Sequence, residues 1–269
     1  MLGAFATNRQ NWRWTQYVLL FFSLFCFIFI ALTKETFPPI LKRRLAKKRG
    51  EEVPPSPPWS AKFRAFALVG LVRPVHMLVA EPIVAFMCTY VAMNFGILFS
   101  FFAAVPYTFG GIYGFNIEQS GLVFLAVAVG CFISVATILY CDFALYRKQV
   151  PNYPPQKIPP EYRLYPAMIG SLGMPLGLFW YAWTAKASVP WASPVVAMIP
   201  FAWGNLCIFV SSAQYMADTY HGSVVASQAS ANSLARYGFA GAFPLFIIQS
   251  KLFKVKIGSV ANGVQCMRS

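Results

Sequence analysis

The chain has 269 residues, of which 58% are hydrophobic and 17% aromatic, and only 11% carry a charge. A soluble domain usually holds about a quarter of its residues as Asp, Glu, Lys and Arg, so this composition excludes an ordinary soluble fold. The formal net charge of +14 would suit nucleic acid, but the basic residues gather in loops between apolar runs. That pattern is typical of membrane proteins, so we expect an all-α integral membrane protein that has the lipid bilayer around it and no nucleic-acid partner.

Six apolar runs are long enough to cross a bilayer, which takes about 20 residues. In chain order they cover residues 16–32, 77–102, 119–141, 164–184, 193–213 and 224–249. The second and third runs contain no charged residue from Pro82 onward, apart from Glu118 between them, whereas Asn232 and Arg236 interrupt the last run. The sequence therefore predicts a multi-pass protein with about six transmembrane helices.

The loops between these runs indicate the orientation and the organisation of the chain. Residues 34–76 combine clusters of Lys and Arg with a proline-rich stretch at 54–58, and residues 142–163 carry further basic side chains. Both loops are cytoplasmic by the positive-inside rule. We expect a first span with a short outer N-terminus at 1–33, a basic Pro-rich cytoplasmic loop at 34–76, a five-helix transmembrane bundle at 77–250 and a polar basic tail at 251–269.

Polar side chains inside the apolar runs are candidates for function, because a charged group at the membrane centre costs about 2.5–3.5 kcal/mol on insertion scales. Gln228, Asn232 and Arg236 recur at every fourth position and share one helical face. Small residues line another face of the same run and would permit close helix packing: Ser227, Ala231, Gly238 and Gly241.

Two earlier runs add further polar candidates. Tyr90 and Asn94 share a face of the second run, and Asn205 lies in the fifth. The candidates for a substrate cavity are Asn94, Tyr90, Asn205, Gln228, Asn232 and Arg236. The alternative is that these side chains only form hydrogen bonds between helices.

No pattern of catalytic or metal-binding residues is present in the sequence. The six cysteines form no C-x-x-C pair and there are only two histidines, so we expect no metal site, no cofactor and no enzyme activity. The acidic residues of the later runs lie at span ends, where they act as caps or solvated charges: Glu81, Glu118, Asp142, Glu161 and Asp218. The chain thus shows no proton-carrying carboxylate of its own in mid-membrane.

Short strings along the chain resemble one known family in their order and spacing. The strings are NWRW at 11–14, ETFPPILKRR at 35–44, RP at 73–74, EPI at 81–83, PEYRL at 160–164, LFWYAWT at 178–184, Tyr215, Asp218 and Tyr220, AN at 231–232, Arg236, and GAFPLF at 241–246. By these strings the chain resembles the fungal drug:proton antiporter branch of the major facilitator superfamily, and it corresponds to spans six to eleven of twelve.

The resemblance implies a partial major facilitator superfamily fold and efflux of small organic compounds in exchange for protons, with the plasma membrane as location. Family members bind substrate between two six-span halves. We therefore expect a truncated form without independent transport, whose partner is the missing N-terminal half or another transporter chain. The resemblance also implies a charged cytoplasmic gate, with Asp142, Arg147, Lys148, Glu161 and Arg163 as candidates. The alternative is a non-transporting membrane protein that packs against a partner transporter.

Overall fold

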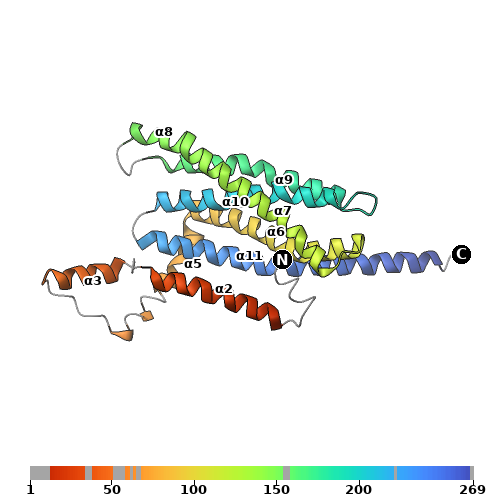
Figure 1. Cartoon of the computed structure of the whole chain (residues 1–269), viewed down its shortest axis with the longest axis horizontal. Helices are drawn as coiled ribbons and strands as arrows, with labels where there is room; N and C mark the ends of the chain where they lie inside the picture. The colour runs from red at the N-terminus through yellow and green to blue at the C-terminus, as the bar shows by residue number, and fades with distance from the viewer. Residues whose placement is uncertain are drawn as a thin grey trace. The chain divides into compact units, whose positions relative to one another are not determined.

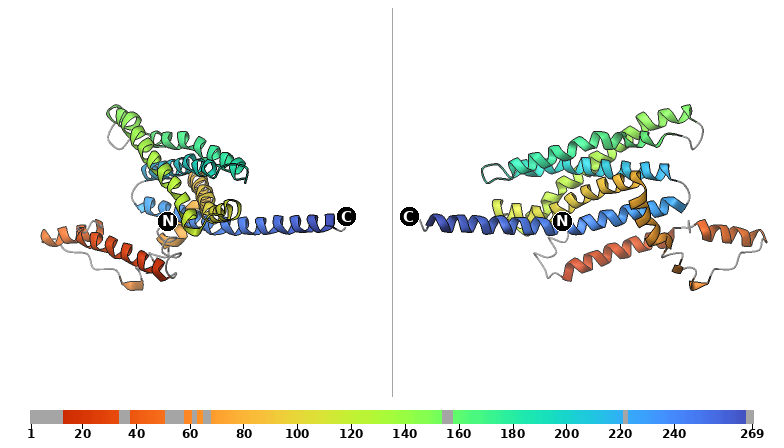
Figure 2. Two further views of the ribbon diagram at one scale, coloured as in Figure 1. Left: turned by 45° about the vertical axis from the view of Figure 1, so that its right-hand side comes forward. Right: turned by 180° about the vertical axis from the view of Figure 1, so that it is seen from behind.

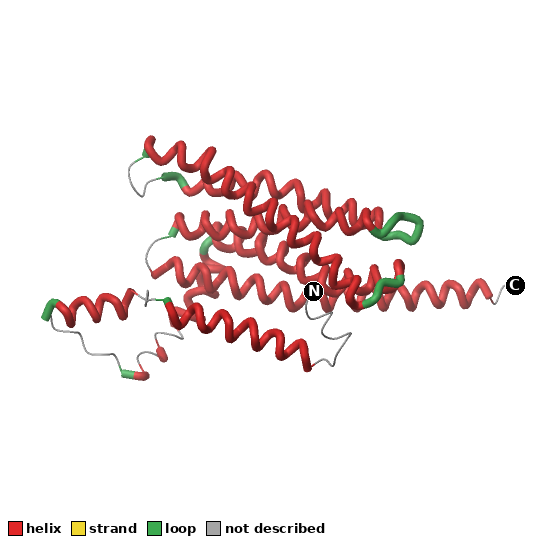
Figure 3. The backbone as a smooth tube through the Cα atoms, viewed as in Figure 1, coloured by secondary structure: helices red, strands yellow, loops and turns green. Residues whose placement is uncertain are grey.

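The structure is a computed structural model of the chain and describes residues 13–33, 38–50, 58–60, 63–64, 68–153, 158–220 and 223–266. These residues are helical apart from short connections, and no strand occurs among them (Figure 3). The chain divides into two units, Met1–Leu68 and Val69–Ser269. The all-α fold class predicted from the sequence is confirmed.

The first unit contains two described helices. The helix α2 (Arg13–Leu32) is apolar on all sides and buries no residue, as expected of a helix that faces lipid all round. The helix α3 (Pro38–Lys48) lies within the predicted basic loop and ends on Lys47 and Lys48, whose charges favour a helix C-terminus. Residues 54–57 of the predicted proline-rich stretch lie outside the described residues.

The second unit is a bundle of long helices joined by short segments (Figure 1). Its long helices are α6 (Pro82–Tyr113), α7 (Ile117–Cys141), α9 (Tyr165–Thr184), α10 (Ala192–Thr219) and α11 (Ser223–Cys266). The short elements are η1 (Leu68–Val72), α5 (Arg73–Ala80), η2 (Asp142–Tyr146), α8 (Arg147–Gln149), η3 (Val150–Asn152) and η4 (Pro160–Leu164).

Several of the predicted span boundaries differ in the structure. The second span does not start at residue 77, because Glu81 takes an extended backbone (φ −106°, ψ 108°) and Pro82 begins a new helix. This helix continues to Tyr113, where Gly114 ends it in the left-handed conformation at φ 66°. The last helix also continues beyond residue 249, as far as Cys266.

Helices occupy all six predicted spans, but they are not equally apolar. Four are long and apolar enough to cross a membrane: Arg13–Leu32, Pro82–Tyr113, Ile117–Asn152 (α7 with the short elements after it) and Ala192–Thr219. The other two predicted spans, α9 and α11, are not among these four. The helix α9 is rich in Gly, Pro and aromatic residues, and α11 carries Gln228, Asn232 and Arg236.

Glycines bring α9 against α10, and the two helices lie side by side in each view (Figure 2). A Cβ atom added at Gly177 would lie 2.6 Å from the backbone N of Phe201, and one at Gly173 would lie 2.8 Å from the carbonyl oxygen of Pro200. The backbones of α9 and α10 are therefore in contact, which is the arrangement that small residues allow between membrane helices.

The predicted small-residue face of α11 is only partly correct. Ser227 and Ala231 are buried, as close packing requires. Gly238 and Gly241 would carry an added Cβ with no atom of the described residues within 4 Å. The prediction of close packing there is wrong, because α11 packs mainly on α6 through a face that contains Phe243, whose ring lies over Gly96.

Candidate functional site

Asn94 and Asn205 meet in the interior of the bundle, between α6 and α10. The Nδ2 of Asn205 donates to the carbonyl oxygen of Asn94 over 3.0 Å, and the Nδ2 of Asn94 donates to the carbonyl oxygen of Tyr90 over 2.6 Å. Both asparagines are buried, and the Oδ1 of Asn94 has no hydrogen-bond partner among the described residues. The Asn205 bond ties two helices, which matches the bridging alternative, while the free Oδ1 leaves one acceptor unused.

The polar face of α11 also points into the bundle. The Nε2 of Gln228 donates to the Sδ of Met216 on α10 over 3.0 Å. Asn232 is only 7% exposed, and its Oδ1 has no partner among the described residues. The hydroxyls of Ser211 and Ser212 of α10 are also buried without a hydrogen-bond partner among the described residues. Gln228 thus acts as a helix bridge, whereas Asn232 keeps a buried acceptor available.

Arg236 lies in the middle of α11 and is surrounded by aromatic rings. Its guanidinium carbon lies 4.5 Å from the ring centroid of Phe95, 4.9 Å from that of Phe209 and 5.0 Å from that of Tyr237. Such cation–π contacts each contribute about 0.5–2 kcal/mol. They lower the cost of placing an arginine in the membrane, which is about 2.5–3.5 kcal/mol. They supply no negative charge, and Nε of Arg236 is buried without a hydrogen-bond partner among the described residues.

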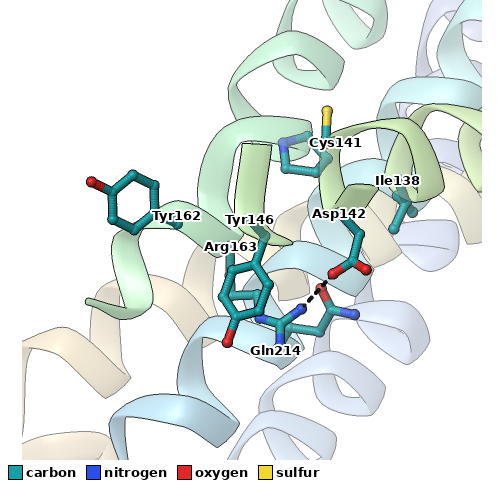
Figure 4. Close-up of a pocket in the computed structure, with 8 residues that line it drawn as sticks. Ile138, Cys141, Asp142, Tyr146, Tyr162, Arg163 and Gln214 are labelled. Atoms are coloured by element: carbon teal, nitrogen blue, oxygen red, sulfur yellow. Dashed lines mark hydrogen bonds and ion pairs between the residues drawn. The ribbon is translucent and has the colours of Figure 1, made fainter. Parts of the chain in front are cut away.

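A second cluster lies at one end of the bundle and consists of charged side chains. Two of them, Asp142 and Arg163, are drawn in Figure 4. Arg163, in η4, bridges two acids: its Nη1 lies 3.1 Å from Oδ1 of Asp142 and its Nε lies 2.9 Å from Oδ2 of Asp218. The Nε of Arg147 adds a contact of 3.1 Å to the other oxygen of Asp142. The end of α7, the start of α9 and the end of α10 are therefore joined by charge-assisted hydrogen bonds.

Arg163 is held more firmly than an ordinary surface arginine. Its guanidinium stacks at 3.6 Å over the ring of Tyr146, and only 21% of its side chain is exposed. Burial tends to lower the pKa of Arg163, but the hydrogen bond and charge of Asp218, followed by Tyr146 and Asp142, raise this pKa above its ordinary value. The guanidinium thus stays charged at any physiological pH.

Three of the five predicted gate residues form this cluster: Asp142, Arg147 and Arg163. Lys148 and Glu161 are exposed and take no part in the ion pairs formed among the described residues. Asp218 is the member that was predicted only as a solvated or capping charge. Nothing in the local sequence pairs it with Arg163, which lies on a different helix end.

A further polar contact at the same end was not predicted. Tyr220, which follows α10, donates its hydroxyl hydrogen to Oε2 of Glu81, the extended residue between α5 and α6. Burial and this hydrogen bond raise the pKa of Tyr220 to about 12. The contact links the α5–α6 junction to the end of α10.

The described residues contain no group of three or more His, Cys, Asp or Glu side chains that could hold a metal ion. The candidate features are a polar, cationic patch in the interior of the bundle and a charge cluster at one end. By its fold and these two features, the chain is of the class of multi-pass membrane proteins that carry polar groups in the membrane interior.

Comparison with known proteins specifies the class further. A sequence profile of the Major Facilitator Superfamily matches residues 1–244. The chain is 39% identical over 249 residues to the MFS-type transporter traF of Penicillium crustosum, which covers 91% of this chain and 50% of traF. It is 33% identical over 300 residues to Polyamine transporter 4 of Saccharomyces cerevisiae, with 99% of this chain and 45% of that protein covered. Efflux pump FUB11 of Gibberella fujikuroi is 32% identical over 260 residues, with 92% and 44% covered.

The chain belongs to the Major Facilitator Superfamily, and it is an integral membrane protein. It spans about half the length of the curated relatives that it matches. No solved structure matches the chain. The relatives are named as transporters and efflux pumps, in agreement with the family predicted from the sequence strings.

Proposed function

We propose that this chain forms part of an efflux antiporter that exports small organic compounds in exchange for protons across the plasma membrane. The observation that carries the proposal is the patch around Arg236, with buried and unpaired acceptors on Asn94 and Asn232. Polar groups in the membrane interior are costly and mark substrate or ion pathways. Relatives named as efflux pumps support the direction of transport.

The six helices correspond in this proposal to spans six to eleven of a twelve-span transporter. The curated relatives are about twice as long, so such a transporter would hold further helices. We propose that these come from the rest of such a transporter, the missing N-terminal half above all, in the same polypeptide or in a second chain, and that substrate binds between the two halves. The 269 residues alone would then not transport.

The charge cluster serves in this proposal as the cytoplasmic gate. Arg163 joins three helix ends through Asp142 and Asp218. Breaking such bonds costs energy that substrate or proton binding can supply, so the cluster can favour one of two arrangements of the bundle. Arg147 reinforces Asp142 at the exposed edge.

Transport by cells tests the proposal directly. The chain is expressed in an efflux-deficient yeast strain, alone and together with the N-terminal half of the traF relative, and export of a panel of acidic, neutral and cationic organic dyes is followed. We expect export only with both halves, and loss of export when a protonophore collapses the proton gradient. Export by the chain alone would refute the need for a second half, and export that ignores the protonophore would refute proton coupling. Absence of export for every dye would refute the transport function, and a fluorescent fusion retained on internal membranes would refute the plasma-membrane location.

A further inference from the structure

Arg236 is a cation in mid-membrane for which the described part of the bundle supplies no carboxylate. At about 1.5 Å per residue, it lies roughly 20 Å along α11 from Ser223, where that helix begins. The described acids, Glu81, Glu118, Asp142, Glu161 and Asp218, all lie at helix ends. The hydrogen bond formed by Arg236 among these residues is a long one, 3.5 Å from Nη2 to the hydroxyl of Tyr237.

Two buried amide oxygens, on α11 and on α6, have no hydrogen-bond partner among the described residues. Asn232 is one turn before Arg236 on the same face of α11, and Asn94 precedes Phe95, whose ring lies under the guanidinium. Asn232 and Asn94 are 7% and 3% exposed, and each has an Oδ1 without a partner among the described residues. Buried polar groups normally have partners, so the Nε of Arg236 is a donor that an acceptor group of a ligand can complete, whereas the two amide oxygens would take a hydroxyl or N–H donor.

Aromatic rings extend from this set along α6. The ring of Phe95 lies 6.2 Å from that of Phe99, which lies 5.6 Å from that of Phe102, and Phe102 stacks at 5.2 Å on Phe124 of α7. Phe99 and Phe102 are 37% and 52% exposed, so their faces are accessible. The patch thus combines one fixed positive charge with an adjoining row of accessible rings.

We propose that this patch binds amphiphilic organic acids, with the anionic group on Arg236 and an aromatic body along Phe99 and Phe102. An arginine forms two parallel hydrogen bonds with a carboxylate, and the aromatic rings keep its charge in place before the ligand arrives. An organic cation in the same place would meet a like charge at close range. The inference rests on the proposed function and names the substrate class of that site.

Direct binding to the purified 269-residue chain in lipid nanodiscs tests this assignment without requiring transport. Three probes of nearly equal shape are titrated by tryptophan fluorescence quenching: naphthoate, its neutral amide naphthamide, and the cation naphthylmethylamine. We expect naphthoate to bind at least about tenfold more tightly than either of the others, as a charge-assisted pair of hydrogen bonds would give. Equal binding of the three probes, or no binding of naphthoate, would overturn the assignment.

Variants locate the binding to Arg236. Arg236→Gln should lose about tenfold or more in affinity for naphthoate and leave naphthamide unchanged, while Arg236→Lys should keep part of the affinity. Arg64→Gln is the matched control, because it removes an exposed arginine that belongs neither to the patch nor to the charge cluster, and it should bind naphthoate as the wild type does. Naphthoate affinity that is the same in Arg236→Gln and the wild type would overturn the proposal. If Arg236→Gln does not fold, as judged by gel filtration, the Lys variant and the three-probe comparison decide.

The outcomes separate this inference from the proposed function. If naphthoate binds through Arg236 but no export occurs with both halves present, the transport proposal fails and the binding site stands. If export occurs but naphthoate binds no better than naphthamide, the transporter stands and the assignment of organic acids fails.

Discussion

The contact between α9 and α10 allows a sharp test of the fold, through replacement of Gly177 by alanine. The added Cβ would lie 2.6 Å from the backbone N of Phe201 and 2.8 Å from the carbonyl oxygen of Ala197. These are backbone atoms that cannot turn aside, so the two helices must separate. Overpacking of this kind costs about 1–3 kcal/mol. Alanine regains about 1 kcal/mol over glycine as a helix former, so we expect a net loss of about 0–2 kcal/mol in the free energy of unfolding.

Gly241→Ala is the matched control, because an added Cβ there meets no described atom within 4 Å. This variant should keep the helix-forming gain and be as stable as the wild type or up to about 1 kcal/mol more stable. The two variants make the same chemical change in two helices of one bundle. Their difference therefore measures the close approach of α9 and α10 and not a general effect of removing glycine.

Thermal unfolding of the purified chain in detergent measures both variants. Accessible thiols are blocked first, and a thiol-reactive fluorogenic dye then reports exposure of the buried Cys88, Cys141 and Cys207 on heating. A loss of 1 kcal/mol corresponds to a fall of roughly 2–4 °C in Tm for chains somewhat smaller than this one. The packing argument is refuted if Gly177→Ala is as stable as Gly241→Ala.

Three further predictions use the same melting assay. Arg163→Gln should lower the free energy of unfolding by about 1–3 kcal/mol, because a partly buried side chain loses charge-assisted bonds to two aspartates. Arg147→Gln, with a side chain that is 60% exposed, should change it by less than about 1 kcal/mol. Asn205→Leu should cost about 0.6–2 kcal/mol through loss of the bond between α10 and α6. Tyr220 has a pKa of about 12 in the folded chain, above the ordinary value of about 10, so its bond to Glu81 stabilises fully below pH 10 and is lost as pH rises to 12.

Each of these three has a distinct contrary result. If the Arg163 and Arg147 variants melt at the same temperature, burial of the charge cluster adds nothing to the stability of the folded chain. An Asn205 variant as stable as the wild type would remove the helix-bridging role of that side chain. For Tyr220, the melting difference between the wild type and Tyr220→Phe should shrink between pH 10 and 12, and a difference that stays constant over this interval contradicts the raised pKa.

The helices and the family could be predicted from the sequence because both depend on local patterns. Apolar runs of bilayer length predict spans, and the string PEYRL or the residues around Arg236 are recognised without knowledge of the fold. The boundary at Glu81 was also readable in principle, since the residue before a proline avoids the helical conformation. The run of apolar residues on both sides of it concealed the break.

Contacts between distant segments could not be predicted in the same way. Asp218 is an ordinary residue at a helix end until the fold brings it within 2.9 Å of Arg163. The glycines are a second example, because Gly177 and Gly241 look alike in sequence and only the fold decides which one faces another backbone. Phe95 and Phe209 likewise enter the site only because α6 and α10 both approach Arg236.

The glycine contact between α9 and α10 has a mechanical consequence. Where side chains separate two helices, the helices can slide as rotamers change, but at Gly177 the facing backbone of α10 leaves no room even for a Cβ atom. The two helices must therefore move as one rigid unit, and Arg163 with its two aspartates lies at one end of that unit. If the helices of this bundle rock, the movement takes place at the other helix–helix contacts. A chemical cross-link between α9 and α10 would then leave this movement unhindered.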